Sequence, residues 1–242
     1  MHLKHSFSPA KRKDRHFIMT YSVTVANNSG APQNVAIFLA DTFGKCCFSL
    51  FSPVWLRSTI NDKGNHQFKW DDTAYGLGWG NATKSIDVGA QFQCGQITSA
   101  FPFTAKGENS LPIGYQNGSF YSGRPYFDNH LMGKLRINTD RSFTVSDALT
   151  MGVALYIDSN AALVAQGAPN TQYIFNIVQF SYYLIVTKCA LGTVLPQSDG
   201  QGRTSAPTLE LDSMTPATRV DFGPGATSLK YDLNGTLDFQ KT

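Results

Sequence analysis

Three side chains that could exchange protons lie close together in the first third of the chain, at His66, Asp71 and Tyr75. Imidazole, carboxylate and phenol groups are common general acids and bases in enzymes. Asp71 and Asp72 are adjacent, so on a strand their carboxylates point to opposite faces and cannot both line one pocket unless a turn intervenes. We take His66, Asp71 and Tyr75 as the candidate catalytic residues. The alternative is that the aspartates only form a turn.

Glycine occupies positions 76, 78 and 80 of the same region. A dinucleotide-binding loop would need a further glycine at position 81, which is asparagine, so that motif is absent. Alternating glycine leaves one face of a strand without side chains, where a ring or another backbone can approach closely. Trp70, Tyr75 and Trp79 would then border an open pocket on this face. The alternative is that these rings only pack in the core.

The segment 106–129 is rich in glycine, asparagine and serine, and it also carries several aromatic residues. Aromatic side chains on a long loop either pack the loop down or close over a ligand. Arg124 could hold an anion or a carboxylate, and His130 follows the loop. The predicted ligand-binding residues are therefore Trp70, Trp79, Tyr121, Arg124, Tyr126 and His130.

Other common catalytic and metal-binding patterns are missing from the sequence. No Gly-x-Ser-x-Gly elbow is present, and neither His66 nor His130 has a second histidine at metal-ligand spacing. We therefore expect no metal and no cofactor. The four cysteines, at positions 46, 47, 94 and 189, lack a CxxC spacing, so we expect free thiols in a reducing compartment.

The net charge of +3 is concentrated at the start of the chain. Five basic residues and one acidic residue give the first 18 residues a charge of +4, so the remainder carries −1. We predict that residues 1–18 are a disordered or non-native basic extension before Met19. The rest offers no basic face for nucleic acid, and no apolar run approaches the ~20 residues of a membrane span. These features favour a cytoplasmic protein without nucleic-acid or membrane partners.

Short segments rich in β-branched and aromatic residues recur between turn residues along the whole chain. Residues 20–26 alternate as in a half-buried strand, and residues 35–40 form a continuous apolar run typical of a central strand. Residues 49–58 carry apolar residues at near-helical spacing and could form a short helix or turn. We predict an all-β, single-domain antiparallel β-sandwich over residues 19–242, with a barrel as second choice. Extra C-terminal strands are expected from about residue 205.

Several of these segments resemble the RhiA family of rhizosphere-expressed proteins. The matching patches are residues 21–29, 68–73, 78–80, 164–175 and 182–186. The resemblance implies membership of the family over about residues 20–190, but the family brings no established catalytic residues. The chain departs from the family pattern after Leu191, which leaves some 50 further residues.

Taken together, the residues favour a protein that binds a small organic ligand in an aromatic-lined pocket. The ligand would be an apolar or aromatic metabolite, or a sugar. The alternative is a cofactor-independent cyclase, isomerase or pericyclase of natural-product biosynthesis, which needs mainly shape and desolvation. A third class is a self-assembling protein whose strand edges pair between subunits, and a homo-oligomer is therefore possible.

Overall fold

The computed structural model describes residues 20–41, 49–71, 73–104, 107–177, 180–196, 198–199, 203–204 and 214–242. Apart from the 3-10 turn η1 (Asn129–Leu131), the regular elements of these residues are all β-strands. The predicted all-β class is confirmed. Outside the described residues lie the predicted extension 1–18, residues 205–213 at the start of the expected C-terminal strands, Asp72, Cys46 and Cys47.

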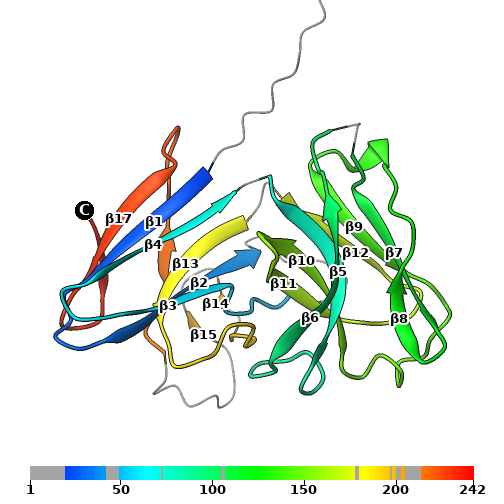
Figure 1. The fold of residues 1–242 in the computed structure, drawn as a ribbon, viewed down its shortest axis with the longest axis horizontal. Helices are drawn as coiled ribbons and strands as arrows, with labels where there is room; N and C mark the ends of the chain where they lie inside the picture. The colour runs from blue at the N-terminus through cyan, green and yellow to red at the C-terminus, as the bar shows by residue number, and fades with distance from the viewer. Residues whose placement is uncertain are drawn as a thin grey trace, which may run out of the picture.

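One half of the molecule, at the left of Figure 1, is a sandwich of two four-stranded sheets with the orders β18-β17-β1-β4 and β16-β13-β2-β3. The strands of the first sheet are β1 (Thr20–Asn27), β4 (Asn65–Asp71), β17 (Ser228–Leu233) and β18 (Phe239–Lys241). Those of the second are β2 (Gln33–Asp41), β3 (Leu56–Ile60), β13 (Phe180–Val186) and β16 (Thr218–Val220). Strands from both ends of the chain therefore build this half.

The other half is a second pair of four-stranded sheets, with the orders β11-β10-β5-β6 and β12-β9-β7-β8 (Figure 1). The first sheet contains β5 (Tyr75–Ala82), β6 (Phe92–Ala100), β10 (Met151–Ile157) and β11 (Asn160–Gln166). The second contains β7 (Ser110–Gln116), β8 (Ser119–Ser122), β9 (Lys134–Thr139) and β12 (Gln172–Asn176). β14 (Ser198–Asp199) and β15 (Arg203–Thr204) form a separate two-stranded sheet. The predicted sandwich class is confirmed, since none of these sheets closes into a barrel.

Two strand pairs among the described residues are parallel, although the sheets are otherwise antiparallel. β17 lies parallel to β1, with Val23 opposite Leu229 and Val25 opposite Tyr231. β9 lies parallel to β7. Parallel neighbours require a crossover connection rather than a tight turn. The C-terminal strand β17 thus lies beside β1, the first strand of the described chain.

β2 and β10 are buried on both faces, as continuous apolar runs predict for central strands. Along β2, Val35, Ile37 and Leu39 point into the main core, while Ala36 and Phe38 belong to a second cluster on the other side of the sheet. Every residue of β10 is buried. The prediction that residues 35–40 form a central strand is confirmed.

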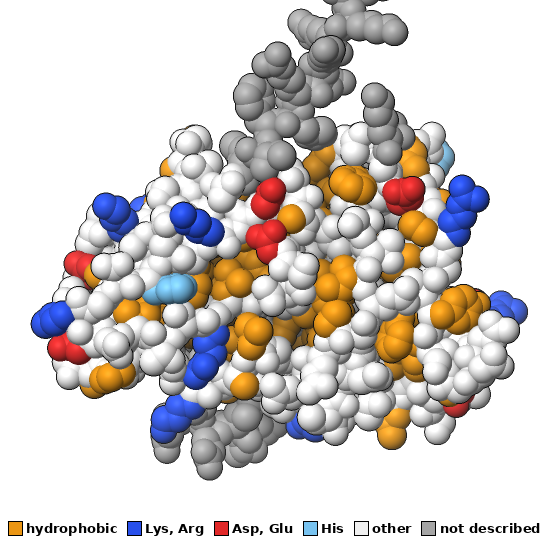
Figure 2. All heavy atoms as spheres, viewed as in Figure 1, with side chains coloured by type: hydrophobic (Ala, Val, Ile, Leu, Met, Phe, Trp, Pro, Cys, Tyr) orange, Lys and Arg blue, Asp and Glu red, His pale blue; other side chains and the backbone are white. Residues whose placement is uncertain are grey.

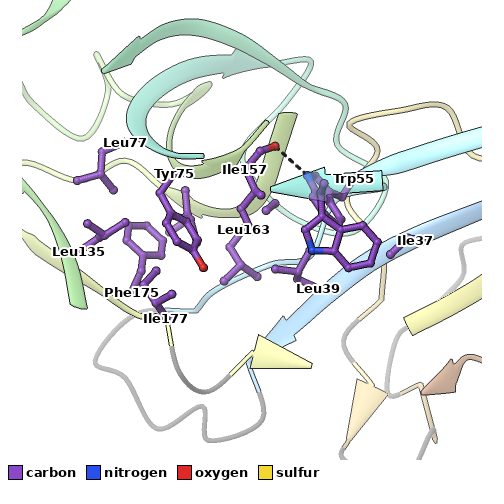
Figure 3. Packing of buried hydrophobic residues seen from close by; sticks show 14 of the residues in the cluster. Ile37, Leu39, Trp55, Tyr75, Leu77, Leu135, Ile157, Leu163, Phe175 and Ile177 are labelled. Carbon is purple, nitrogen blue, oxygen red and sulfur yellow. Dashed lines mark hydrogen bonds between the residues drawn. The ribbon is translucent and has the colours of Figure 1, made fainter. Parts of the chain in front are cut away.

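The segment before β3 joins the two halves, and the short helix considered for residues 49–58 is wrong. Phe51 forms a β-bridge with Val164 of β11, and Pro53 forms one with Val194. The residue before a proline is disfavoured in helical conformation, so Pro53 outweighs the near-helical apolar spacing. The indole Nε1–H of Trp55 donates to the carbonyl oxygen of Ile157 at 3.2 Å (Figure 3).

The two halves share one continuous core. Figure 3 shows Ile37, Leu39 and Trp55 of the first half packed beside Ile157 and Leu163 of the second. All of these side chains are at most 1% exposed. The junction is therefore a dry packing interface.

A Trp55→Phe variant tests the importance of this junction. The variant keeps an aromatic ring but removes the indole donor, and it leaves a buried carbonyl without that hydrogen bond. We expect a loss of about 1–3 kcal/mol in the free energy of unfolding, measured by denaturant titration. A variant as stable as the parent protein would show that the halves are held together without this bond.

Candidate functional site

An aromatic cleft of about 420 Å³ opens where the two halves meet. Its size lies within the roughly 300–1,000 Å³ of typical ligand pockets. The β1, β13 and β16 side of the first half provides one wall, and the start of β5 with the segment after β6 provides the other. In Figure 2, apolar side chains gather along the join between the two halves. The aromatic residues that line the cleft are Tyr21, Tyr75, Phe103, Phe180, Tyr182 and Phe222.

The cleft rings are held from behind by Trp70, which is only 1% exposed. The Trp70 ring stacks on Tyr21 at a centroid distance of 6.0 Å and contacts Tyr182 at 4.9 Å. Phe222 meets Tyr21 edge-on at 4.8 Å and Trp70 at 5.8 Å. Trp70 takes this position because side chains alternate along β4, so that it points inward with Phe68. The rings of this wall are therefore fixed by their contacts with one another.

Two charged residues, Arg219 and Asp221, stand at the cleft on either side of Val220. Val220 is 4% exposed and points into the core. Arg219 lies on β16 and Asp221 directly follows its end, and both residues are exposed at the cleft. The Arg219 guanidinium forms no hydrogen bond or ion pair with a described residue. Oδ1 of Asp221 accepts the Gly223 N–H at 3.0 Å, which fixes the carboxylate.

The open face expected on the glycine strip is wrong. A Cβ atom on Gly78 would overlap the backbone oxygen of Gln96 on β6, and one on Gly80 would overlap that of Gln93. A Cβ on Gly76 would lie 2.6 Å from Cγ2 of Ile97. The alternating glycines do permit a close approach, but the backbone of the neighbouring strand fills the space. At Gly80 the ring of Phe92 also lies against the strip, so no space remains for a ligand ring.

Trp79 does not share a pocket with Trp70. Trp79 lies on β5 and packs against Phe120 at 5.8 Å, beside Tyr115 and Phe143 in the second half. Trp70 belongs to the ring cluster of the first half. Of the aromatic trio predicted to border one pocket, only Tyr75 lines the cleft.

The predicted catalytic residues His66, Asp71 and Tyr75 do not meet in one site. His66 is half-buried on β4, where its ring meets Phe68 edge-on at 4.7 Å. Asp71 lies five positions further along the strand, roughly 16 Å away at about 3.3 Å per residue. Oδ1 of Asp71 accepts both the N–H and the hydroxyl of Thr73 at 2.8 Å. Asp71 therefore forms the turn between β4 and β5, as the alternative interpretation proposed.

The prediction of a long loop over residues 106–129 is wrong, because β7 and β8 lie within this segment and Tyr121 belongs to β8. The ligand residues predicted there and His130 lie on the second half, outside the cleft lining. Tyr121, Arg124, Tyr126 and His130 are exposed there. The Tyr126 hydroxyl accepts hydrogen bonds from Arg136 and from Asn138, both at 2.8 Å. These bonds hold the connection between β8 and η1 against β9, so Tyr126 has a packing role.

Asp128 also holds the connection between β8 and η1 in place. Its Oδ1 accepts the His130 N–H at 2.9 Å, and its Oδ2 forms an ion pair with Arg136 at 2.9 Å. The His130 N–H, and after it the Arg136 guanidinium, hold the pKa of Asp128 below its ordinary value of 3.8. A lowered folded-state pKa means that the carboxylate stabilises the fold above the unfolded pKa.

An Asp128→Asn variant should therefore be destabilised near neutral pH. The difference in unfolding free energy from the parent protein should shrink as the pH falls below about 4, where the parent also loses its charge. Denaturant titrations at several pH values between neutral and acid would measure this. A difference that stays constant over that range would show that the Asp128 charge does not support this connection.

Sequence reasoning missed the cleft residues Tyr21, Tyr182, Arg219, Asp221 and Phe222. Each is on or next to a strand that the residue pattern indicates, but the pattern does not show which strands adjoin. The alternation of Arg219, Val220 and Asp221 was the available signal. It places two charged residues two positions apart at the end of a short strand.

The described residues hold neither a membrane-length helix nor a cluster of three or more His, Cys, Asp or Glu side chains able to hold a metal ion. Cys94 and Cys189 are free thiols.

The sequence profile of the RhiA family matches residues 19–207. The chain belongs to the RhiA family. The RhiA match continues past Leu191, where the sequence patches suggested that the resemblance ends. It includes Tyr21, Tyr75 and Tyr182 and stops before β16, so the cleft residues 219–223 come from outside it. No curated protein and no solved structure shows a significant match to the chain.

Proposed function

We propose that this RhiA-family protein binds a small organic ligand in the cleft between its two halves. The observation that carries the proposal is the convergence of aromatic rings from β1, β5, β13 and the end of β16 on one opening. Ligand pockets are typically concave, rich in aromatic side chains and supplied with a few polar groups. Arg219 and Asp221 provide such groups here.

The wall formed by Tyr21, Tyr182 and Phe222 suits binding because it is already ordered. Each of these rings contacts another ring or Trp70 within 6.3 Å. A ligand that lies against fixed rings does not have to order them, which removes part of the free-energy cost of association. Rings that interlock also keep the cleft from closing when it is empty.

Binding is favoured over a cofactor-independent cyclase, isomerase or pericyclase. His66 and Asp71, the residues considered for acid–base roles, are not part of the cleft lining. Arg219 and Asp221 are exposed, whereas electrostatic catalysis gains most in a site that excludes water. We place the protein in the cytoplasm because its described cysteines are free thiols, which a reducing compartment preserves.

The test is a binding screen read by the intrinsic fluorescence of the tryptophans. Trp70 touches three rings of the cleft, so occupancy should change its emission. Monosaccharides, phenols and aromatic carboxylates would be titrated against the full-length protein. At least one class should bind saturably.

Phe222→Ala and Tyr121→Ala form a matched pair for any compound that binds. Each removes one partly exposed ring, but only Phe222 lines the cleft. We expect Phe222→Ala to weaken binding by about tenfold, the equivalent of about 1.4 kcal/mol, and Tyr121→Ala to leave it unchanged. Thermal melts would verify that both variants fold. The reverse pattern would place the site beside β8 in the second half.

A further inference from the structure

We propose that the ligand is a neutral sugar ring, and that Arg219 and Asp221 select it through paired hydrogen bonds. This inference rests on the proposed function and specifies its substrate class. It goes further in assigning selectivity to the C-terminal segment, which lies outside the family match. Charge, free hydrogen-bonding capacity and the aromatic wall each support it.

The charge at the cleft favours a neutral ligand. Among the residues that line the cleft, Arg219 and Asp221 carry the formal charges, and they have opposite signs. An anionic ligand would be attracted by Arg219 but repelled by Asp221, and a cationic ligand would meet the opposite pair of effects. The contributions of Arg219 and Asp221 largely cancel at similar distances. Lys241, whose Nζ donates to the Asp221 carbonyl oxygen at 2.8 Å, lies outside the cleft lining. A neutral ligand with both donors and acceptors can use both groups.

Both charged groups have unused hydrogen-bonding capacity. A guanidinium offers five N–H donors in a planar fork, and that of Arg219 makes no bond to a described residue. Asp221 uses Oδ1 for the Gly223 N–H and accepts no bond from a described residue at Oδ2. Arg219 and Asp221 are two positions apart, so their backbones lie at most about 7 Å apart. At this spacing the long Arg219 side chain and the fixed Asp221 carboxylate can reach neighbouring hydroxyl groups of one sugar ring, with Arg219 donating and Asp221 accepting.

The aromatic wall provides the remaining part of sugar recognition. The face of an aromatic ring carries partial negative charge, and the C–H groups on one side of a pyranose carry partial positive charge. A sugar can therefore lie flat against a ring while its hydroxyls point to polar groups at the rim. Phe222 directly follows Asp221 and contacts Tyr21 at 4.8 Å, so rings and charged groups adjoin in the cleft.

The residues that line the cleft come from two different parts of the chain. Tyr21, Tyr75 and Tyr182 lie within residues 19–207, which the family profile matches, whereas Arg219, Asp221 and Phe222 lie beyond it. The matched region alone thus forms an aromatic half-site without its charged residues. Selectivity for a hydroxyl-rich ligand should accordingly depend on the C-terminal segment.

The experiment compares three probes on the full-length protein: a series of neutral methyl pyranosides, phenol and benzoate. Binding would be measured by tryptophan fluorescence and calorimetry at low and high sodium chloride. We expect one or more pyranosides to bind with an affinity that salt barely changes, because the ligand is neutral. Arg219→Gln and Asp221→Asn should each weaken pyranoside binding tenfold or more. Lys230→Gln, which removes an exposed charge outside the cleft lining, should have no effect.

Each other outcome overturns a definite part of the proposal. Salt-sensitive binding of benzoate without pyranoside binding would make the cleft an anion site and refute the sugar. Binding of phenol alone would leave the proposed function standing and refute the sugar. Pyranoside binding that survives both cleft substitutions would remove Arg219 and Asp221 as the selecting residues. Failure of all three probes in the screen would count against the proposed function itself.

Discussion

A chain that ends at residue 213 should lose the native fold of its first half. β16, β17 and β18 would be missing, and with them five apolar side chains that are at most 8% exposed: Val220, Leu229, Tyr231, Leu233 and Phe239. Burial of each contributes about 1.5–3 kcal/mol, so the total is roughly 8–15 kcal/mol. That sum is comparable to the whole stability of about 5–15 kcal/mol of a typical protein. β1 would also lose its parallel partner.

The loss would be measured by thermal unfolding and limited proteolysis of the shortened chain. A chain that starts at Met19 is the control, because composition alone predicts that residues 1–18 add little to stability. We expect the control to melt within about 2–4 °C of the parent protein, the scale of 1 kcal/mol at this size. If the chain ending at 213 melted equally close to the parent, the C-terminal strands would be an accessory to the sandwich.

A Gly78→Ala variant should be destabilised by about 3 kcal/mol or more, at or above the upper end of typical overpacking costs. The added Cβ would overlap the Gln96 oxygen and would lie 3.2 Å from Cα of Ile97. Both atoms belong to the backbone of β6, which is hydrogen-bonded along β5 and cannot rotate aside as a side chain can. The sheet would have to part or shift register at this point.

Gly235→Ala is the matched control for this substitution. A Cβ there meets no atom within 4 Å, and Gly235 is not among the glycines with positive φ. Its effect should stay within about 0.5 kcal/mol, as for most surface substitutions. A Gly78→Ala protein as stable as this control would mean that the strip is open, as the glycine pattern first suggested.

The local sequence of this protein predicts which segments form strands, but it does not predict which strands pair with one another. Residues 35–40 indicate a buried central strand because every position is apolar, and β2 is such a strand. Nothing local indicates that β17 lies beside β1, since that contact joins opposite ends of the chain without a turn between them. The glycine strip shows the same limit. Alternation predicts a close approach, but it does not distinguish a ligand ring from the backbone of β6.

The candidate cleft could be located only in part from the sequence. Tyr75 lines the cleft and the Trp70 ring contacts Tyr21, Tyr182 and Phe222, so part of the cleft lies near the predicted residues. Trp79 is four positions further along β5, roughly 13 Å away at about 3.3 Å per residue, and it reaches another cluster. Phe222 joins Tyr21 and Tyr75 only through the packing of three distant segments.

Chemical-shift mapping by nuclear magnetic resonance tests the central claim most directly. The isotope-labelled full-length protein would be titrated with the tightest-binding methyl pyranoside from the screen. The cleft predicts that the largest shift changes occur at Tyr21, Tyr75 and Phe222, with little change at Trp79 and Tyr121. Changes concentrated at Trp79 and Tyr121, with none at Phe222, would contradict a ligand site between the two halves.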